Sequence, residues 1–286
     1  MTKKFLITAG MALIACKCLV GCELSNVISA GPMVTDSRSV KQDSARSALV
    51  QLDMNVGDLR LTGGGSDLMN AEFQYNIPEW KPDVQYSVNG NRGTLVVRQP
   101  TVKNMAVRHA QNHWDVHLRD LVPMDLRIRT QTGSSDLHLN RLALTSLAAD
   151  TQTGGVAVDL GGKYADLNTV DIHSQTGHCT VTMTGDYPLL SNINIGTQTG
   201  SVTADLSGHW GKSADGQIKS QTGSVTVTLP TDMGVYVTAH KQTGHISATG
   251  LNVQGDAYTN DAYGKSPVTL RLNVSVNTGD ISLRTR

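Results

Sequence analysis

Apolar and polar residues alternate in short runs along most of the chain. Between Val225 and Leu229, for example, apolar side chains are separated by Thr226 and Thr228. This two-residue period is typical of β-strands that bury one face. No stretch of useful length shows the 3.6-residue period of an amphipathic helix. The pattern therefore predicts an all-β protein.

A Gln-Thr-Gly triplet recurs through the second half of the chain. Its copies begin at Gln131, Gln152, Gln175, Gln198, Gln221 and Gln242, and a variant begins at Asn277. Successive copies are 21, 23, 23, 23, 21 and 35 residues apart. A period of this size predicts a solenoid, in which each unit buries its apolar face by stacking on its neighbours.

The copies also align on either side of the triplet. The fourth residue after the glutamine is small or apolar in every copy: Ser135, Val156, Cys179, Val202, Val225, Ile246 and Ile281. Three residues before it stand Ile128, Ala149, Ile172, Ile195, Ile218, Ala239 and Val274. These positions must face inward together. We expect a single-stranded, right-handed parallel β-helix with three short strands per coil, because parallel crossovers are nearly always right-handed.

Each Thr-Gly pair is expected to form a corner between two strands. Glycine suits a corner with positive φ, a conformation that costs other residues about 1 kcal/mol. The corner glycines are Gly133, Gly154, Gly177, Gly200, Gly223, Gly244 and Gly279. The preceding glutamines are in position to stack as an amide ladder along the coils.

Residues 48–105 are expected to form a small β-domain that covers the N-terminal end of a solenoid at 106–286. The segment Asn55-Val56-Gly57 is an early, degenerate copy of the repeat, and alternation at 71–75, 84–89 and 94–98 indicates further strands. The longer gap before Asn277 indicates a projecting loop. The last coil, ending at Arg286, is expected to be an exposed edge.

The start of the chain is typical of a targeting segment. Lys3 and Lys4 precede an apolar run that is too short to span a membrane. Leu19-Val20-Gly21-Cys22 resembles the lipobox of bacterial lipoproteins. This resemblance implies that residues 1–21 are removed, that Cys22 is acylated, and that the protein is a membrane-anchored lipoprotein at the cell surface or in the periplasm. The polar residues 22–47 are expected to be a flexible tether.

Three further segments resemble the toast-rack or auto-transporter adhesin domains of bacterial envelope proteins (DUF4097-like and DUF2154-like). They are residues 55–61 (NVGDLRL), 114–118 (WDVHL) and 123–126 (PMDL), together with the Thr-Gly repeats. The resemblance implies an all-β fold and an envelope location. The same segments are similar also to the C-terminal region of proteins in envelope stress responses. The resemblance implies no catalytic residues.

Composition limits the partners. Lys and Arg number 24, as do Asp and Glu, and loss of residues 1–21 would remove three lysines and leave a slightly acidic chain. Such a charge balance does not favour nucleic acid as a partner. Of four cysteines, only Cys179 would then be a free thiol, so no disulfide is expected. Its inward position indicates a small buried side chain.

Two constellations resemble catalytic or metal sites. His109, His113 and His117 have the four-residue spacing of zinc ligands on a helix, but the alternation around them predicts a strand, which separates the rings. Asp159 and Asp205 share one register two coils apart, about 9.6 Å, as in inverting glycosidases. No aromatic sugar platform accompanies them. We therefore expect no metal, no cofactor and no enzyme activity.

The outward positions after the triplet supply a candidate binding face. Five threonines share it: Thr180, Thr182, Thr203, Thr226 and Thr228. A flat hydroxyl array can bind glycans, although β-propensity alone also explains threonine there. The sequence thus predicts a lipid-anchored binding, adhesion or structural module whose partners are the membrane and an envelope glycan or protein. Regulation of envelope stress is the alternative, and a carbohydrate-active enzyme the third possibility.

Overall fold

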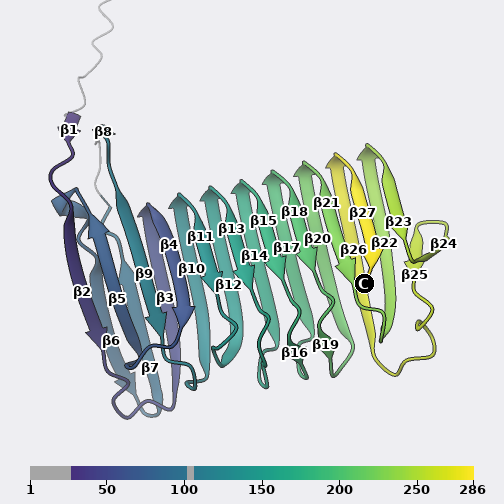
Figure 1. The fold of residues 1–286 in the computed structure, drawn as a ribbon, viewed down its shortest axis with the longest axis horizontal. Helices are drawn as coiled ribbons and strands as arrows, with labels where there is room; N and C mark the ends of the chain where they lie inside the picture. Colours follow the sequence, from purple (N-terminus) through teal and green to yellow (C-terminus); the bar gives the residue numbers. More distant parts are fainter. Residues whose placement is uncertain (1–26, 102–105) are drawn as a thin grey trace, which may run out of the picture.

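Two long sheets run the length of the protein (Figure 1). The computed structural model describes residues 27–101 and 106–286. One sheet has twelve strands, in the order β24 (Asn252–Gln254), β25 (Ala257–Thr259), β22 (Gly234–Thr243), β26 (Thr269–Thr278), β20 (Ala214–Thr222), β17 (Asn192–Thr199), β14 (Thr169–Thr176), β12 (Leu144–Thr153), β10 (Met124–Thr132), β3 (Ser47–Val56), β7 (Arg92–Arg98) and β6 (Asp83–Asn89).

The other sheet has eleven strands, and a few short elements complete the fold. The order is β2 (Val34–Val40), β5 (Met69–Tyr75), β9 (Asn112–Leu118), β4 (Asp58–Gly63), β11 (Ser135–His138), β13 (Val156–Asp159), β15 (Cys179–Thr182), β18 (Val202–Asp205), β21 (Val225–Leu229), β27 (Ile281–Thr285) and β23 (Ile246–Thr249). The short elements are β1 (Val27–Ser29), β8 (Ala106–Arg108), β16 (Asp186–Tyr187), β19 (His209–Trp210) and the 3-10 helix η1 (Pro78–Trp80).

Each repeat supplies one long strand and one short strand, joined at the Gln-Thr-Gly corner. Neighbouring coils pair in parallel with the triplets in register, as in Thr176↔Thr199 and Thr199↔Thr222. The inward columns are buried, and Ile172, Ile195 and Ile218 are each 0% exposed. The prediction of an all-β chain with long parallel sheets is confirmed.

The coils contain two extended strands, and a third side is formed only locally. Its only named strands in the described residues are β16 and β19, of two residues each. They belong to coils of 23 residues, which carry a Gly-x-aromatic motif ending at Tyr164, Tyr187 or Trp210. These rings are buried. Tyr164 and Tyr187 stack with ring centroids 5.6 Å apart, and the Trp210 ring is tilted against Tyr187 with centroids 5.1 Å apart. The expectation of three strands in every coil is therefore wrong.

The last two coils are stacked out of sequence order. Strand β26 lies between β20 and β22, and β27 lies between β21 and β23 (Figure 1, the yellow strands). Residues 250–268 include the β24–β25 hairpin against the outer edge of β22, and then the chain returns inward. The prediction that the C-terminal coil is an exposed edge is wrong, because β22 and β23 occupy the end of the stack.

The N-terminal end is closed by strands from outside the repeat. Residues 47–63 form a coil that pairs directly with β10 and β11, as the degenerate repeat predicts. Strands β7 and β9 pair with it in parallel. Beyond them the antiparallel strands β6, β5 and β2 complete the two sheets. Both sheets continue across residue 105, where the sequence predicts a domain boundary.

Part of the expected tether is a strand. Residues 34–40 form β2, which pairs with β5 along its whole length. Strand β2 is the edge strand of its sheet, and most of its side chains are exposed. This exposure explains why its composition is typical of a linker. The targeting segment and Cys22 lie outside the described residues. Within the described part of the chain, no helix has the length and apolar character needed to cross a membrane.

Candidate functional site

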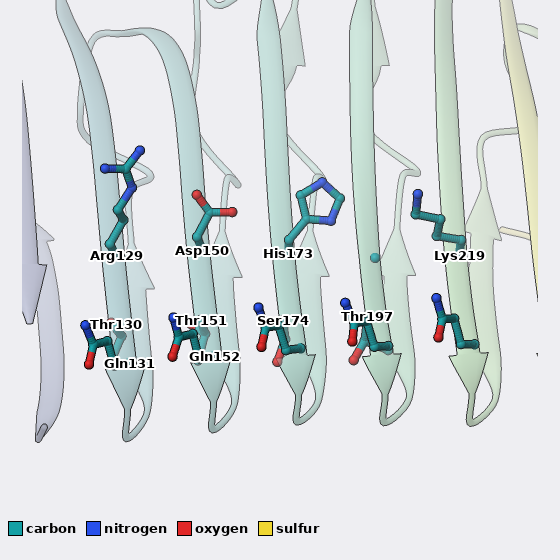
Figure 2. A pocket seen from close by; sticks show the side chains of 14 residues that line it. Arg129, Thr130, Gln131, Asp150, Thr151, Gln152, His173, Ser174, Thr197 and Lys219 are labelled. Atoms are coloured by element: carbon teal, nitrogen blue, oxygen red, sulfur yellow. The ribbon is translucent and has the colours of Figure 1, made fainter. Parts of the chain in front are cut away.

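A hollow of about 550 Å³ follows the glutamine column on the outer face of the twelve-stranded sheet (Figure 2). One side is lined by Gln131, Gln152, Gln175, Gln198 and Gln221. The other is lined by the residues two positions earlier, namely Arg129, Asp150, His173, Gly196 and Lys219. We call this hollow the glutamine groove. It arises because the period-two alternation sends both positions of each strand outward.

Gly196 interrupts the second row of side chains. A Cβ built on Gly196 would lie 3.2 Å from both His173 Nδ1 and Lys219 Cγ, and the backbone has no positive φ there. Glycine is therefore not needed for the conformation of the strand. Without a Cβ, Gly196 leaves space for the His173 and Lys219 side chains, and it is itself buried.

A column of buried hydroxyls lies beneath the groove. Its members precede the glutamines and are 2–4% exposed: Thr130, Thr151, Ser174, Thr197 and Ser220. Three of them donate to the corner glycine carbonyl of the previous coil, Ser174 to Gly154 at 3.2 Å, Thr197 to Gly177 at 3.2 Å and Ser220 to Gly200 at 2.9 Å. These bonds hold successive corners in one register. The sequence signal is the Ser or Thr before each of the first five Gln residues of the repeat.

The glutamine amides themselves are exposed and aligned (Figure 2). In the parts of the chain that the structure describes, no hydrogen bond joins one of these amides to the next. The expected alignment is present without the hydrogen bonds of an amide ladder. Each amide thus keeps its two N–H donors and its carbonyl acceptor for a ligand.

The charges along the groove are mixed. His173 Nε2 lies 2.8 Å from Asp171 Oδ1 and 3.0 Å from the Asn194 amide nitrogen. Arg129 and Lys219 form no ion pair with any residue of the described ranges. Two cationic side chains therefore stand at the groove with their charges available, four coils apart, or roughly 19 Å at the usual strand spacing.

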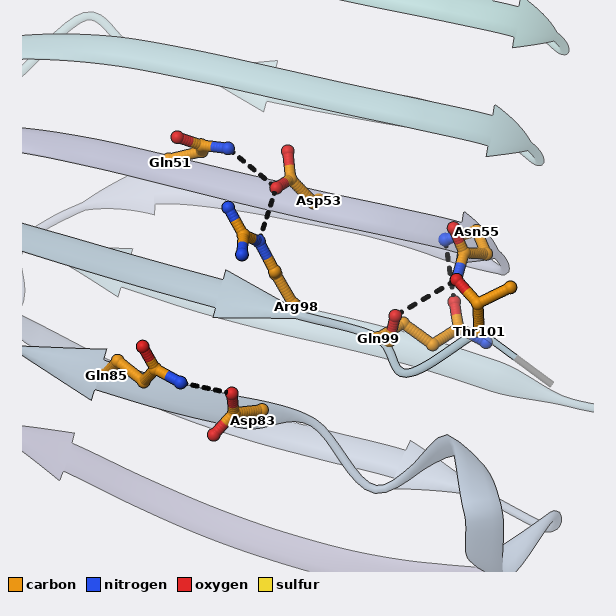
Figure 3. A network of polar contacts seen from close by, with 8 residues as sticks. All are labelled: Gln51, Asp53, Asn55, Asp83, Gln85, Arg98, Gln99 and Thr101. Carbon is orange, nitrogen blue, oxygen red and sulfur yellow. Dashed lines mark hydrogen bonds and ion pairs between the residues drawn. The ribbon is translucent and has the colours of Figure 1, made fainter.

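The groove continues toward the N-terminal end in a second hollow of about 260 Å³. Arg129 and Gln131 line both hollows. Here Gln99, 4% exposed, lies against Asn55 (Figure 3). Its side-chain oxygen accepts hydrogen bonds from the backbone N–H groups of Asn55 and Val56 at 2.8 and 2.9 Å. The Asn55 amide donates to the Gln99 carbonyl at 3.0 Å. The Gln99 side chain thus supplies the hydrogen-bond partner for the backbone of β3 beyond the end of β7.

The threonines proposed as a binding face do not form one continuous surface. Thr180, Thr203 and Thr226 occupy neighbouring positions on β15, β18 and β21. Asp205 separates Thr182 from Thr228 in the other column. Thr228 is only 2% exposed and accepts a hydrogen bond from Arg284 Nε at 3.0 Å. The outward orientation predicted for Thr228 therefore does not leave it accessible.

The corner glycines lie in one column through the stack. The seven predicted glycines have φ between 126° and 151°. A Cβ on Gly200 would lie 1.9 Å from the Gly177 carbonyl oxygen, and one on Gly133 would lie 1.7 Å from that of Gly57. The role of these residues is thus structural, since the backbones of successive corners are in direct contact.

The remaining candidates are placed apart from the groove. His113 and His117 lie exposed on β9, His113 near Asp58 (3.5 Å) and His117 within 2.7 Å of the Thr62 hydroxyl, while His109 is exposed in a connection. Among the described residues, no group of three His, Cys, Asp or Glu could hold a metal ion.

Asp159 and Asp205 flank Thr182 on the eleven-stranded sheet, as their register predicts. Cys179 is 0% exposed, and its thiol donates to the Gly196 carbonyl at 3.3 Å. Burial raises the pKa of this thiol to about 12, so it is a protonated core residue rather than a nucleophile.

Comparison with known proteins gives a family match. The model described as the N-terminal domain of toast_rack, DUF2154, matches residues 29–182. No curated protein matches the chain. One similar solved structure is a "putative cell adhesion protein" from Clostridium sporogenes ATCC 15579, with 25% identity, 89% of this chain and 100% of that chain covered, and a TM-score of 0.48. Another is a "putative adhesin" from Bacteroides fragilis NCTC 9343, with 13% identity, coverage of 90% and 99%, and a TM-score of 0.37.

Proposed function

Because the chain belongs to the toast-rack family through its N-terminal domain, we propose that it is a non-enzymatic binding module of the bacterial envelope that holds an extended glycan along the glutamine groove. The observation that carries this proposal is the row of five exposed amides beside a hollow of about 550 Å³. The rest of the proposal follows from the chemistry and rigidity of that row.

Primary amides suit a ligand rich in hydroxyl groups. Each amide offers donors and an acceptor, and each sugar hydroxyl can donate and accept in return. Amides on every second coil are about 9.6 Å apart, a span comparable to two linked sugar rings. A glycan chain laid along the groove would therefore meet equivalent amides at regular intervals.

Pre-organisation of the groove supports tight binding. The corner backbones are in contact and are joined by the buried hydroxyl column, so little order has to be gained when a ligand binds. The His173 and Lys219 side chains that flank Gly196 favour a negatively charged substituent on the glycan.

The lining of the groove favours binding over hydrolysis. Glycosidases place two carboxyl groups on either side of the scissile bond, whereas Asp150 is the one carboxylate among the residues that line the groove. We also propose that acylation at Cys22 anchors the module to the membrane and that its coils are right-handed. Mass analysis of Cys22 and a crystal structure test these two points.

A matched pair of variants tests the groove. Gln175→Ala/Gln198→Ala removes two amides, while Thr180→Ala/Thr203→Ala changes two outward residues of the same two coils on the opposite sheet. We would measure binding of the full chain carrying Cys22→Ser to an array of cell-wall glycan fragments and neutral hexose polymers. Loss of two hydrogen bonds is expected to weaken binding by about 10-fold in the glutamine variant. The threonine variant should bind as the parent does.

The opposite result would assign binding to the threonine columns that the sequence predicts. If the parent chain binds none of these glycans, the proposal fails. Gly196→Leu adds a third arm, because a Cβ there would lie 3.2 Å from both His173 Nδ1 and Lys219 Cγ and a larger side chain would displace them. It should weaken binding of a glycan with carboxylate substituents more than binding of a neutral one.

A further inference from the structure

The out-of-order coil occupies a slot that both sheets form together. Strand β26 pairs in parallel with β20 on one side and with β22 on the other, and β27 pairs likewise with β21 and β23. The register is continuous across the slot, as in Thr222↔Thr278↔Thr243. Residues 269–286 thus supply a complete coil between two coils that precede them in the sequence.

The side chains of this segment fit the coil before the slot. Gly216 faces inward without a side chain, and a Cβ there would lie 2.7 Å from Leu272 Cδ2, so Leu272 fills its space. Arg284 Nε donates to Thr228 Oγ1 at 3.0 Å, and the Arg286 backbone N–H donates to the Leu229 carbonyl at 3.0 Å. The slot therefore recognises this segment through shape and hydrogen bonds.

Lys241 prevents the slot from closing. Its position, before the glutamine, holds a buried residue in the neighbouring coils, Ser220 at 3% exposed and Val276 at 2%. Lys241 is exposed because its coil ends the stack. If β22 paired directly with β20 and the last coil stacked outside it, the ammonium group would be enclosed between Ser220 and Val276. An unpaired buried charge is strongly unfavourable, so the coil of Lys241 must stay at the end.

The end coil is also held by contacts that do not involve the inserted segment. The Asn260 amide donates to the carbonyls of Pro230 and Met233 at 3.2 and 2.7 Å, and its oxygen accepts from the Val235 N–H at 2.9 Å. Strand β25 pairs with the outer edge of β22. These contacts give the end coil part of its structure without residues 269–286.

The connector to the inserted segment is exposed. Residues 261–268 include no buried side chain, and Gly264 has a φ of 78°. Eight residues can extend to about 26 Å. We propose that the slot is a strand-acceptor site that takes residues 269–286 of a second copy of this chain, giving a reciprocal exchange. This inference goes beyond glycan binding and does not rest on it.

The chain's own segment competes for the slot with an effective concentration in the millimolar range, as for other short linkers. Exchange between copies is therefore expected when copies are concentrated, and when the connector is too short for insertion into its own slot.

Cysteine cross-linking tests the exchange. Thr226 lies on β21 at one wall of the slot and pairs with Ser282 of the inserted segment, and neighbouring strands about 4.8 Å apart allow a disulfide. One full chain carries Thr226→Cys, another carries Ser282→Cys with a larger tag, and in both Cys16, Cys18 and Cys22 are replaced by Ser. The control replaces Thr226→Cys with Thr180→Cys, which lies three coils from Ser282.

After refolding the two chains together at high concentration, we expect about 10-fold more cross-linked heterodimer than in the Thr180→Cys control, and more still when residues 262–265 are deleted. A chain with both Thr226→Cys and Ser282→Cys must also form the bond internally. The proposal is overturned if that internal bond fails to form. It is equally overturned if the internal bond forms while the bond between copies stays at the control level, even with the shortened connector.

Discussion

The two sides of a coil are packed in opposite ways, one by backbone contact and the other by large side chains. At the Gln-Thr-Gly corner the backbones touch, and a Cβ on Gly200 would lie 1.9 Å from the Gly177 carbonyl. On the far side of the 23-residue coils, the space is filled by Tyr164, Tyr187 and Trp210. The corner side sets the register of the coils because no side chain fits between the backbones. The aromatic side sets the width of the coil because large rings fill it.

Adding a single carbon to the corner should have the largest effect. Gly200→Ala combines a φ of 139° with a clash against backbone that has no freedom to rotate away. We expect the free energy of unfolding to fall by about 4 kcal/mol or more, which is an exceptionally large loss for a single substitution. Urea denaturation of the purified variant measures it.

Gly255→Ala is the matched control for this variant. Gly255 also has positive φ, 60°, but no atom lies within 4 Å of an added Cβ. It should lose only about 1 kcal/mol, the cost of the conformation alone. Equal losses at Gly200 and Gly255 would show that the corner can relax and that backbone contact does not set the register.

Removing a ring from the far side should have the next largest effect. Tyr187→Ala leaves a cavity between Tyr164 and Trp210 and removes the hydroxyl that bonds to the Leu160 carbonyl and the Gly185 N–H. We expect a loss of about 3 kcal/mol in the free energy of unfolding. Tyr187→Phe keeps the ring and should lose about 1 kcal/mol. If the two variants are equally unstable, the hydroxyl bonds rather than the filled volume hold this side together.

The aromatic side should also make the protein sensitive to alkali. Burial raises the pKa of Tyr164 and of Tyr187 above the ordinary value of 10. The folded state thus keeps both phenols protonated, and its stability is complete below pH 10 and is lost as the pH rises past it. The slope is up to about 1.4 kcal/mol per pH unit for each phenol. Urea midpoints taken between about pH 9 and 11 should fall less steeply in Tyr164→Phe/Tyr187→Phe, and an unchanged slope would refute this assignment.

The corner side was predictable from sequence and the aromatic side was not. The triplet recurs at intervals of 21 to 23 residues in six consecutive copies, and the inward columns beside it keep a strict two-residue period. The Gly-x-aromatic motif that ends in a buried ring occurs in three coils, and each of these rings stands twelve residues after the glutamine. Alignment of the residues nearest the triplet therefore misses it, although its 23-residue spacing was a usable signal.

The insertion of the last coil left no trace in the spacing of the two coils that it separates. Gln221 and Gln242 are 21 residues apart, the same distance as Gln131 and Gln152, although another coil separates the first pair in space. Strand order here depends on Lys241 and on the contact between Gly216 and Leu272, which lie 56 residues apart. Period analysis compares equivalent positions and so is insensitive to contacts of this kind.

The glutamine groove was not predicted as a binding site, because the sequence favoured the threonine face. The glutamine column follows directly from the repeat, which predicts an amide ladder, but the hollow beside it also depends on the row two positions earlier, in which Gly196 is a single departure. The threonine face followed from the same alternation. Arg284, on β27 near the end of the chain, covers Thr228. The accessibility of Thr228 could therefore not be judged from the register alone.

The smallest effect is expected from the hydroxyl column, which supports the corner without filling space. Ser220→Ala removes the donor to the Gly200 carbonyl and should cost about 1 kcal/mol. Thr203→Ala, on the exposed face of the neighbouring coil, should stay within about 0.5 kcal/mol of the parent in the same urea titration. Val276 fills the same column one coil later, so the column does not require a hydroxyl everywhere. If Ser220→Ala is as stable as Thr203→Ala, contact between the glycine backbones alone sets the register, and the contrast between the two sides of the coil becomes sharper.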